Sequence, residues 1–158
     1  MALHFSKQEF LQRKTKVLQS MKEQNLDAVL MFRQESMYWL TGYDTFGYVF
    51  FQTLVLDNKG NIILLTRAPD LRQAQNTSNI EDIRIWVDKD GSNPTDDLKN
   101  ILDELSLKEK RVGVEYEAYG LTGRNTLRLN KSLENYCNIE DQSELITKIR
   151  VVKSSEEI

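Results

Sequence analysis

Short apolar runs alternate with segments of helical periodicity along almost the whole chain. The apolar runs are rich in the β-branched and aromatic residues typical of strands, and a turn at Asp57-Asn58-Lys59-Gly60 joins two of them as a hairpin. The predicted strands cover residues 27–32, 48–56, 61–66, 83–87, 111–115 and 136–139. Because one hairpin interrupts an otherwise alternating order, the pattern predicts an α/β fold with a β-sheet of mixed direction covered by helices.

Capping residues mark where several helices begin. Ser6 and Glu9 form a capping box, and Asn93 is a good N-cap for a helix with Pro94 at its first position. The expected buried face of the first helix consists of Phe10, Leu11, Val17, Leu18 and Met21. Further helices are predicted at residues 35–40, 70–76, 94–105, 122–133 and 144–152.

Composition limits the class of protein. The chain has 158 residues, enough for one domain with its own core. Its 21 basic and 24 acidic residues are spread along the sequence without a basic stripe, which argues against nucleic acid as a partner. No apolar run approaches the roughly 20 residues that span a bilayer, and residues 1–10 lack the apolar stretch of a signal peptide. We therefore expect no membrane partner. The single cysteine, Cys137, cannot form an internal disulfide, so we also expect a cytoplasmic protein.

The sequence offers few groups for catalysis. The single histidine, His4, lies near the N-terminus, where exposure is the ordinary expectation, and no nucleophile can be paired with a histidine base. Thr122-Gly123-Arg124 suits an anion site or simply a helix cap, and a metal site built from carboxylates alone stays open. We therefore expect no catalytic residue, no metal ligand and no cofactor in this chain.

Aromatic residues are concentrated in one part of the sequence. Eight of the 14 aromatic residues lie within twenty positions, namely Phe32, Tyr38, Trp39, Tyr43, Phe46, Tyr48, Phe50 and Phe51. Some of them belong to the core, because neighbours on a strand face opposite sides. The segment 41–47 reads instead as a loop flanked by two glycines, and aromatic rings on such a loop favour an interaction surface for a ligand or a partner.

The last residues read as the beginning of a helix. Ser154 would be its N-cap and Glu157 would complete a capping box, with Glu156 in the first turn. A frayed polar tail is the alternative, since serine and glutamate are common in tails. The capping box favours a longer protein that continues past this point.

A family resemblance appears at Tyr38-Trp39-Leu40-Thr41-Gly42-Tyr43. This segment resembles the Tyr-x-Leu-Thr-Gly-aromatic signature in the N-terminal domain of creatinases, prolidases and aminopeptidases P. The preceding strand Asp27-Ala28-Val29-Leu30 and the final Arg150-x-x-Lys153-Ser154-x-Glu156-x-Ile158 are also similar to that domain and its exit. The likeness covers essentially the whole chain. It implies a mixed β-sheet with helices on both faces and ribonuclease-H-like topology, with residues 1–150 as the N-terminal domain and 151–158 as the start of a linker.

The resemblance also implies what the parent protein does. Family members are metal-dependent hydrolases of Xaa-Pro dipeptides, longer peptides, creatine or other small amides. Their two divalent ions (Mn, Co or Zn) lie in a following "pita-bread" domain, so this chain alone is expected to be inactive. The expected partners are that catalytic domain, a second subunit in a homodimer and a small peptide or amide substrate.

The loop after the Leu-Thr-Gly turn is the segment expected to reach the partner subunit. By resemblance, Tyr43, Asp44, Phe46 and Tyr48 would help to line the substrate pocket in trans, with Asp44 either meeting a substrate amine or capping its own loop. Two other readings stay open. One is a stand-alone module that binds a ligand or protein with the same loop, and the other is a small α/β enzyme with an unrecognised site.

Overall fold

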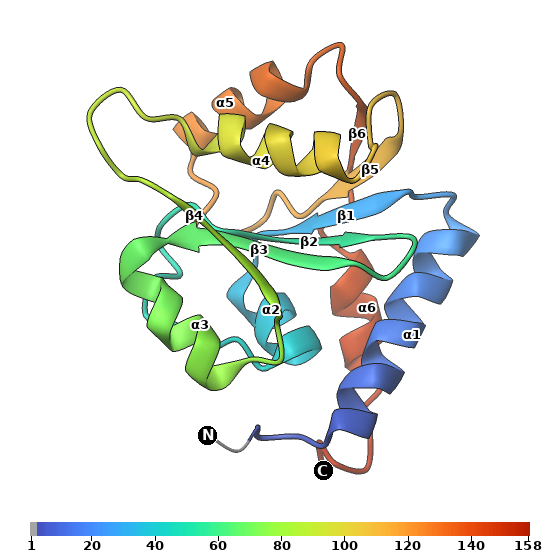
Figure 1. Cartoon of the computed structure of the whole chain (residues 1–158). Coiled ribbons are helices and arrows are strands. Elements are labelled where there is room, and N and C mark those ends of the chain that lie inside the picture. The colour runs from blue at the N-terminus through green and yellow to red at the C-terminus, as the bar shows by residue number, and fades with distance from the viewer. Residues whose placement is uncertain (1–2) are drawn as a thin grey trace.

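Six strands form one sheet, with helices on both faces. The computed structural model describes residues 3–158. The elements in chain order are α1 (Lys7–Glu23), β1 (Ala28–Met31), α2 (Gln34–Thr41), β2 (Thr53–Asp57), β3 (Ile62–Arg67), the 3-10 turn η1 (Ala68–Asp70), α3 (Leu71–Thr77), β4 (Asp82–Trp86), α4 (Pro94–Glu104), β5 (Arg111–Val114), α5 (Gly123–Leu133), β6 (Asn138–Asp141) and α6 (Leu145–Val151). Helices α1, α2, α3 and α6 lie below the sheet in Figure 1, and α4 and α5 lie above it.

The sheet has the order β4-β3-β2-β1-β5-β6. β2 pairs antiparallel with both β1 and β3, whereas the pairs β1–β5, β5–β6 and β3–β4 are parallel. The antiparallel part follows from the predicted hairpin, whose turn is closed by Asp57 Oδ1 accepting from the N–H groups of Lys59 and Asn61 at 3.0 and 2.8 Å. The predicted mixed sheet with helices on both faces is therefore confirmed.

The central strands are buried on both faces and divide the core into two halves. Along β1, Ala28 and Leu30 belong to the core cluster between the sheet and helices α4 and α5. Val29 and Met31 belong to the core cluster on the other face, between the sheet and helices α1, α2, α3 and α6. This alternation follows from the period of two in a strand. It explains why β1 is apolar at every position.

Three predicted helix starts are confirmed by their capping bonds. Ser6 accepts from the N–H of Glu9, and Asn93 accepts from the N–H of Thr95. Thr122 accepts from the N–H of Asn125, so the Thr122-Gly123-Arg124 segment acts as a helix cap. Each side chain satisfies a backbone donor that has no partner inside its own helix.

The strand predicted over residues 48–56 is only half formed, because β2 begins at Thr53. The N–H of Phe50 donates to the carbonyl of Gly47 at 3.0 Å in a turn. The carbonyl of Phe51 accepts from the indole Nε1 of Trp86 at 3.0 Å instead of a ladder partner. Gly120 crosses here so closely that a Cβ on it would lie 2.6 Å from the carbonyl oxygen of Phe50. These long-range contacts replace strand pairing.

Smaller predictions were also wrong. Leu11 is 56% exposed rather than part of the buried face of α1. The last strand begins at Asn138 instead of Tyr136, because the N–H of Tyr136 closes the turn after α5 on the carbonyl of Leu133. No helix forms at Ser154. Only the reciprocal half of its capping box is present, with the Ser154 N–H donating to Glu157 at 2.9 Å.

Candidate functional site

Two neighbouring parallel strands open a crevice at their carboxyl ends. The chain leaves β1 toward α2 on one face of the sheet and leaves β5 toward α5 on the other (Figure 1). Because the two connections leave the sheet on opposite faces, a crevice lies between them, and ligands of α/β proteins commonly bind in such a crevice. The topology therefore points to the segments directly after Met31 and Val114.

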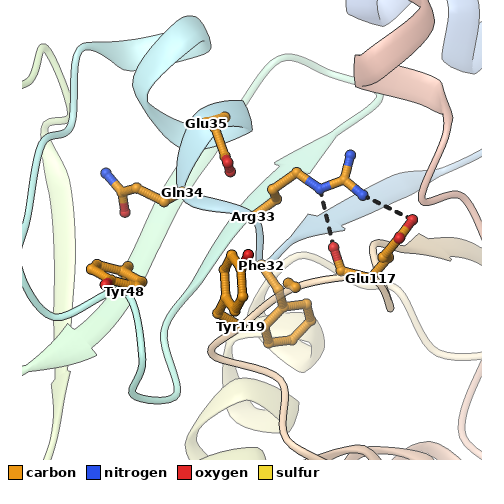
Figure 2. Close-up of a pocket in the computed structure, with 8 residues that line it drawn as sticks. Phe32, Arg33, Gln34, Glu35, Tyr48, Glu117 and Tyr119 are labelled. Atoms are coloured by element: carbon orange, nitrogen blue, oxygen red, sulfur yellow. Dashed lines mark hydrogen bonds and ion pairs between the residues drawn. The ribbon is translucent and has the colours of Figure 1, made fainter.

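The crevice contains a cleft of about 450 Å³. Its walls are formed by Phe32, Arg33, Gln34, Glu35, Tyr48, Glu117, Ala118 and Tyr119 (Figure 2). These residues come from residues 32–35, residue 48 and the distant segment 117–119, which meet because β1, β2 and β5 are neighbours in the sheet. The cleft combines aromatic walls with carboxylate, amide and guanidinium groups, a mixture suited to a small polar ligand with an apolar part.

Glu115 holds the floor of this cleft in place. Its side chain is fully buried, and Oε2 accepts from the N–H groups of Phe32 and Arg33 at 3.1 and 3.0 Å. The hydroxyl of Ser36 donates to Oε1 at 2.6 Å. Burial raises the pKa of Glu115 to about 6, against the opposing effect of these hydrogen bonds. Glu115 thus ties the end of β5 to the beginning of α2.

Arg33 lines the cleft, but the N–H donors of its guanidinium group already have partners within the protein. Its Nε donates to the carbonyl of Glu117 at 3.0 Å and its Nη1 donates to the hydroxyl of Thr147 at 2.6 Å. Nη2 contacts the Glu117 carboxylate at 3.4 Å, as Figure 2 shows. Arg33 therefore fixes the segment after β5 against α6 rather than offering a free charge.

Four exposed aromatic side chains lie at the cleft or on the segment that leads to it: Tyr48 and Tyr119 line the cleft, and Phe46 and Phe50 stand two residues before and after Tyr48. We call Phe46, Tyr48, Phe50 and Tyr119 the aromatic rim. Phe46 is 93% exposed and Tyr119 is 81% exposed. Tyr48 and Tyr119 pack edge to face with centroids 6.2 Å apart, and the guanidinium of Arg67 lies 3.4 Å from the centre of the Phe50 ring. Exposed aromatic groups at this density mark an interaction surface.

Hydrogen bonds to Asp70 and Thr45 anchor the loop that carries Phe46. Asp70 accepts from the hydroxyl of Thr45 at 2.9 Å, and the same hydroxyl accepts from the N–H of Gly47 at 2.9 Å. A Cβ at Gly47 would lie 2.4 Å from Asp70 Oδ1, so only glycine fits this close approach. Phe46 is thus presented to solvent by a well-anchored backbone.

The structure places the four predicted substrate-binding residues in different environments. Tyr43 is fully buried, and its hydroxyl donates to Gln52 at 2.6 Å, so its predicted place on an exposed loop was wrong. Burial also raises the pKa of Tyr43. Asp44, Phe46 and Tyr48 are exposed, but only Tyr48 lines the cleft. Asp44 lines a second cavity, and its N–H donates to the hydroxyl of Thr77 at 3.0 Å.

Of the eight residues that line the cleft, only Tyr48 was predicted from the sequence as a binding residue. Glu35 was assigned only to the start of a helix, and Gln34, Glu117 and Tyr119 to connections. Position at the carboxyl ends of two parallel strands is the signal that would have found them. That signal requires knowing that β1 and β5 are adjacent, which the order of strands along the chain does not reveal.

The side chains do not fit a metal centre. Among residues 3–158, no group of three or more His, Cys, Asp or Glu side chains is placed to hold an ion. His4 is exposed, and its Nδ1 contacts the Tyr38 hydroxyl at 2.5 Å. Within the same part of the chain, no helix has the length and apolar character to cross a membrane.

Comparison with known proteins identifies the family. The model of the creatinase/prolidase N-terminal domain matches residues 13–152. The chain belongs to the creatinase/prolidase N-terminal domain family. Its resemblance at Tyr38–Tyr43 is thereby confirmed, and with it the assignment to the N-terminal domain of this family.

Curated relatives of this family member are longer proteins. An uncharacterised hydrolase/peptidase of Sinorhizobium fredii is 31% identical over 163 residues, covering 99% of this chain and 41% of the relative. An ectoine hydrolase of Halomonas elongata is 26% identical over 164 residues, with the same coverage of 99% and 41%. The chain therefore spans about two-fifths of the length of these relatives.

Solved structures confirm the fold. A prolidase from Thermococcus sibiricus superposes with a TM-score of 0.76 at 15% identity, covering 94% of this chain and 38% of that one. An Xaa-Pro aminopeptidase structure from Streptococcus pyogenes gives a TM-score of 0.73 at 19% identity, covering 92% of this chain and 100% of that one. At these identities the comparison shows the fold alone.

Proposed function

We propose that this chain is the non-catalytic N-terminal domain of a metal-dependent hydrolase that cleaves Xaa-Pro dipeptides or related small amides. The family match and the hydrolase relatives support a hydrolase parent. The observation that carries the proposal is the exposed aromatic rim on an anchored loop, in a chain whose described carboxylates form no metal-binding group. Such a domain supplies shape and apolar walls rather than reacting groups.

In this proposal the aromatic rim meets the active site of a second subunit in a homodimer. Phe46 and Tyr48 would exclude water from the substrate and contact its apolar part, and Asp44 would face the same pocket. Tyr43 contributes from inside, by fixing the loop through Gln52 rather than by touching substrate. The cleft residues Gln34 and Glu35 extend this wall with polar groups.

Two divalent ions, Mn, Co or Zn, belong to the following catalytic domain in this proposal. Bound there, they would supply Lewis-acid chemistry toward a water molecule and an amide carbonyl. The domain boundary near residue 150 and a cytoplasmic location stay predictions from the sequence.

The test replaces the rim in the full-length parent protein. We expect Phe46→Ala and Tyr48→Ala each to lower kcat/KM for an Xaa-Pro dipeptide roughly tenfold, because each removes apolar contact with the substrate. Bound metal, measured by elemental analysis, should stay at the wild-type level. Leu127→Ala is the matched control, since Leu127 is 73% exposed on α5 and lies outside the rim. Unchanged kinetics in both rim variants would remove the proposal.

A stand-alone binding module is the second candidate, and the exposed rim suits it as well. The chain's coverage of 41% of its curated relatives favours the hydrolase. A peptidase assay of the isolated chain with added Mn²⁺ distinguishes these two candidates from the third, a small α/β enzyme with its own active site. The isolated chain should not cleave Xaa-Pro peptides, and measurable turnover would show that the chain is itself an enzyme.

A further inference from the structure

The residues that follow α6 fold back onto α1 and α2. We call residues 152–158 the exit segment. In Figure 1 the C-terminus lies beside the beginning of α1. The carboxylate of Glu156 accepts there from the N–H and the hydroxyl of Ser6, at 3.0 and 2.6 Å. The N–H of Glu157 closes a turn on the carbonyl of Ser154 at 3.1 Å. The exit segment is therefore attached to the rest of the domain by specific bonds.

Glu157 makes the most buried of these attachments. Its Oε1 accepts from the indole Nε1 of Trp39 at 2.9 Å and lies 3.5 Å from Arg13 Nη2. Its Oε2 accepts from the N–H of Ser154 at 2.9 Å, and the side chain is only 13% exposed. Burial raises the pKa of Glu157, but the Ser154 N–H, the Arg13 charge and the Trp39 indole lower it, and the net pKa falls below its ordinary value. Its carboxylate is thus held in the charged form.

Arg13 is the buried counter-charge of this carboxylate. The residue is 1% exposed, and its Nε and Nη1 donate to Glu9 at 2.8 Å and to the carbonyl of Trp39 at 2.7 Å. Nη2 has no hydrogen-bond partner among residues 3–158, so the Glu157 carboxylate is its electrostatic partner. Because a buried charge that loses a partner is costly, these contacts favour the docked position of the exit segment.

Trp39 connects the exit segment to the cleft and the aromatic rim. It belongs to α2, whose first residue, Gln34, lines the cleft. The same helix leads into the loop that carries Phe46, and Gln34 Nε2 donates to the carbonyl of Tyr43 in that loop at 2.8 Å. A rigid helix transmits position from one end to the other. Fixing Trp39 against the exit segment therefore fixes the cleft and the rim against whatever follows that segment.

We propose that Glu157 is a positioning residue, which acts through Trp39 and Arg13 to set the direction in which the chain leaves this domain. It thereby holds the cleft and the aromatic rim in one orientation relative to the catalytic domain. This inference rests on the proposed function, because it requires a catalytic domain after the exit segment. Without such an attachment, two domains joined by a linker move relative to each other by default.

Indole NMR of the isolated chain tests the attachment itself. The chain has two tryptophans, so its proton–nitrogen spectrum contains two indole signals. In Glu157→Ala the Trp39 signal should shift and exchange with water at least roughly tenfold faster, because its acceptor is gone. The Trp86 indole, which donates to the carbonyl of Phe51, should stay unchanged and reports an intact fold. An unchanged Trp39 signal would overturn the attachment.

Small-angle X-ray scattering of the full-length parent tests the orientation independently of activity. Glu157→Ala should have a larger radius of gyration than wild type, because the freed exit segment lets the domain move. Glu157→Gln should scatter like wild type, since its amide oxygen still accepts from the Trp39 indole. Glu134→Ala is the matched control, because Glu134 is exposed after α5, on the opposite face of the sheet. Identical scattering of Glu157→Ala and wild type would overturn the positioning role.

Kinetics of the same parent variants distinguish this inference from the proposed function. We expect Glu157→Ala to lower kcat/KM for an Xaa-Pro dipeptide about tenfold at unchanged bound metal, and Glu157→Gln to stay within about threefold of wild type. A wild-type parent that cleaves no Xaa-Pro dipeptide refutes the proposed function, whereas the scattering result still decides the positioning role. An active parent that is equally active with Glu157→Ala refutes the positioning role alone.

Discussion

Single residues decide how the site is built, and the local sequence predicts the role of some of them but not of others. Glu115 stood in a predicted strand with no assigned role, yet it accepts three hydrogen bonds from the beginning of α2. Tyr43 and Phe46 are both aromatic residues of one loop, but one is fully buried and the other is 93% exposed. No local pattern separates them, because burial of Tyr43 depends on Gln52 and on Thr66 of the neighbouring strand β3.

Glu115 gives a prediction about pH. Its folded pKa of about 6 exceeds the ordinary 4.5, so the folded state binds more protons between these values. Stability from this group is therefore fully present below about 4.5 and is lost as pH rises through about 6, by roughly 2 kcal/mol in total. Urea unfolding across this range should show the loss in wild type relative to Glu115→Gln, which has no charge to bury.

The glutamine variant keeps the geometry. Its amide oxygen can accept from the Phe32 and Arg33 N–H groups, and its NH₂ can donate to the Ser36 hydroxyl. Glu117→Gln is the control, because the Glu117 side chain is 79% exposed. Parallel pH profiles for wild type and Glu115→Gln would refute this role for the buried carboxylate.

The loop aromatics give a second prediction at the residue scale. Tyr43→Ala should lower the free energy of unfolding by about 3–5 kcal/mol, because it empties a fully buried site. Phe46→Ala should change it by less than about 0.5 kcal/mol, since the ring contacts mainly solvent. Denaturant unfolding of the two variants measures the difference, and equal effects would contradict the assignment of core and rim.

At the scale of elements, the sequence predicted what local chemistry controls. Capping residues located the beginnings of α1, α4 and α5. The strand over residues 48–56 failed because Gly120 and Trp86, far away in the chain, bind the first half of that segment. Element ends set by distant segments cannot be derived from a local window.

Two glycine substitutions test the end of α2. Gly42 has a φ of +82°, and a Cβ there would lie 2.8 Å from the carbonyl oxygen of Thr77. Gly42→Ala should therefore cost at least about 1–2 kcal/mol of stability. Gly123, at the start of α5, has open space around it, so Gly123→Ala should be neutral or slightly stabilising. Thermal unfolding compares the two, and equal melting temperatures would contradict the close approach.

At the scale of the whole molecule, the sequence predicted the fold class and the family but not the cleft. The cleft exists because β1 and β5 are adjacent although 80 residues of sequence, including three strands, separate Met31 from Val112. Of the predicted loop residues, Tyr48 lines this cleft, where it meets Tyr119. The shape of the site is therefore a product of sheet order, whereas its aromatic character was readable in the sequence.

Subunit complementation tests most directly whether the rim completes a partner's active site. A full-length variant with Phe46→Ala and Tyr48→Ala is mixed and refolded with a second variant that lacks metal ligands in the catalytic domain. Mixed dimers then hold one intact metal site facing one intact rim, so activity should return to about a quarter of wild type for random pairing. If the rim served its own subunit or no active site at all, the mixture would be no more active than its two components.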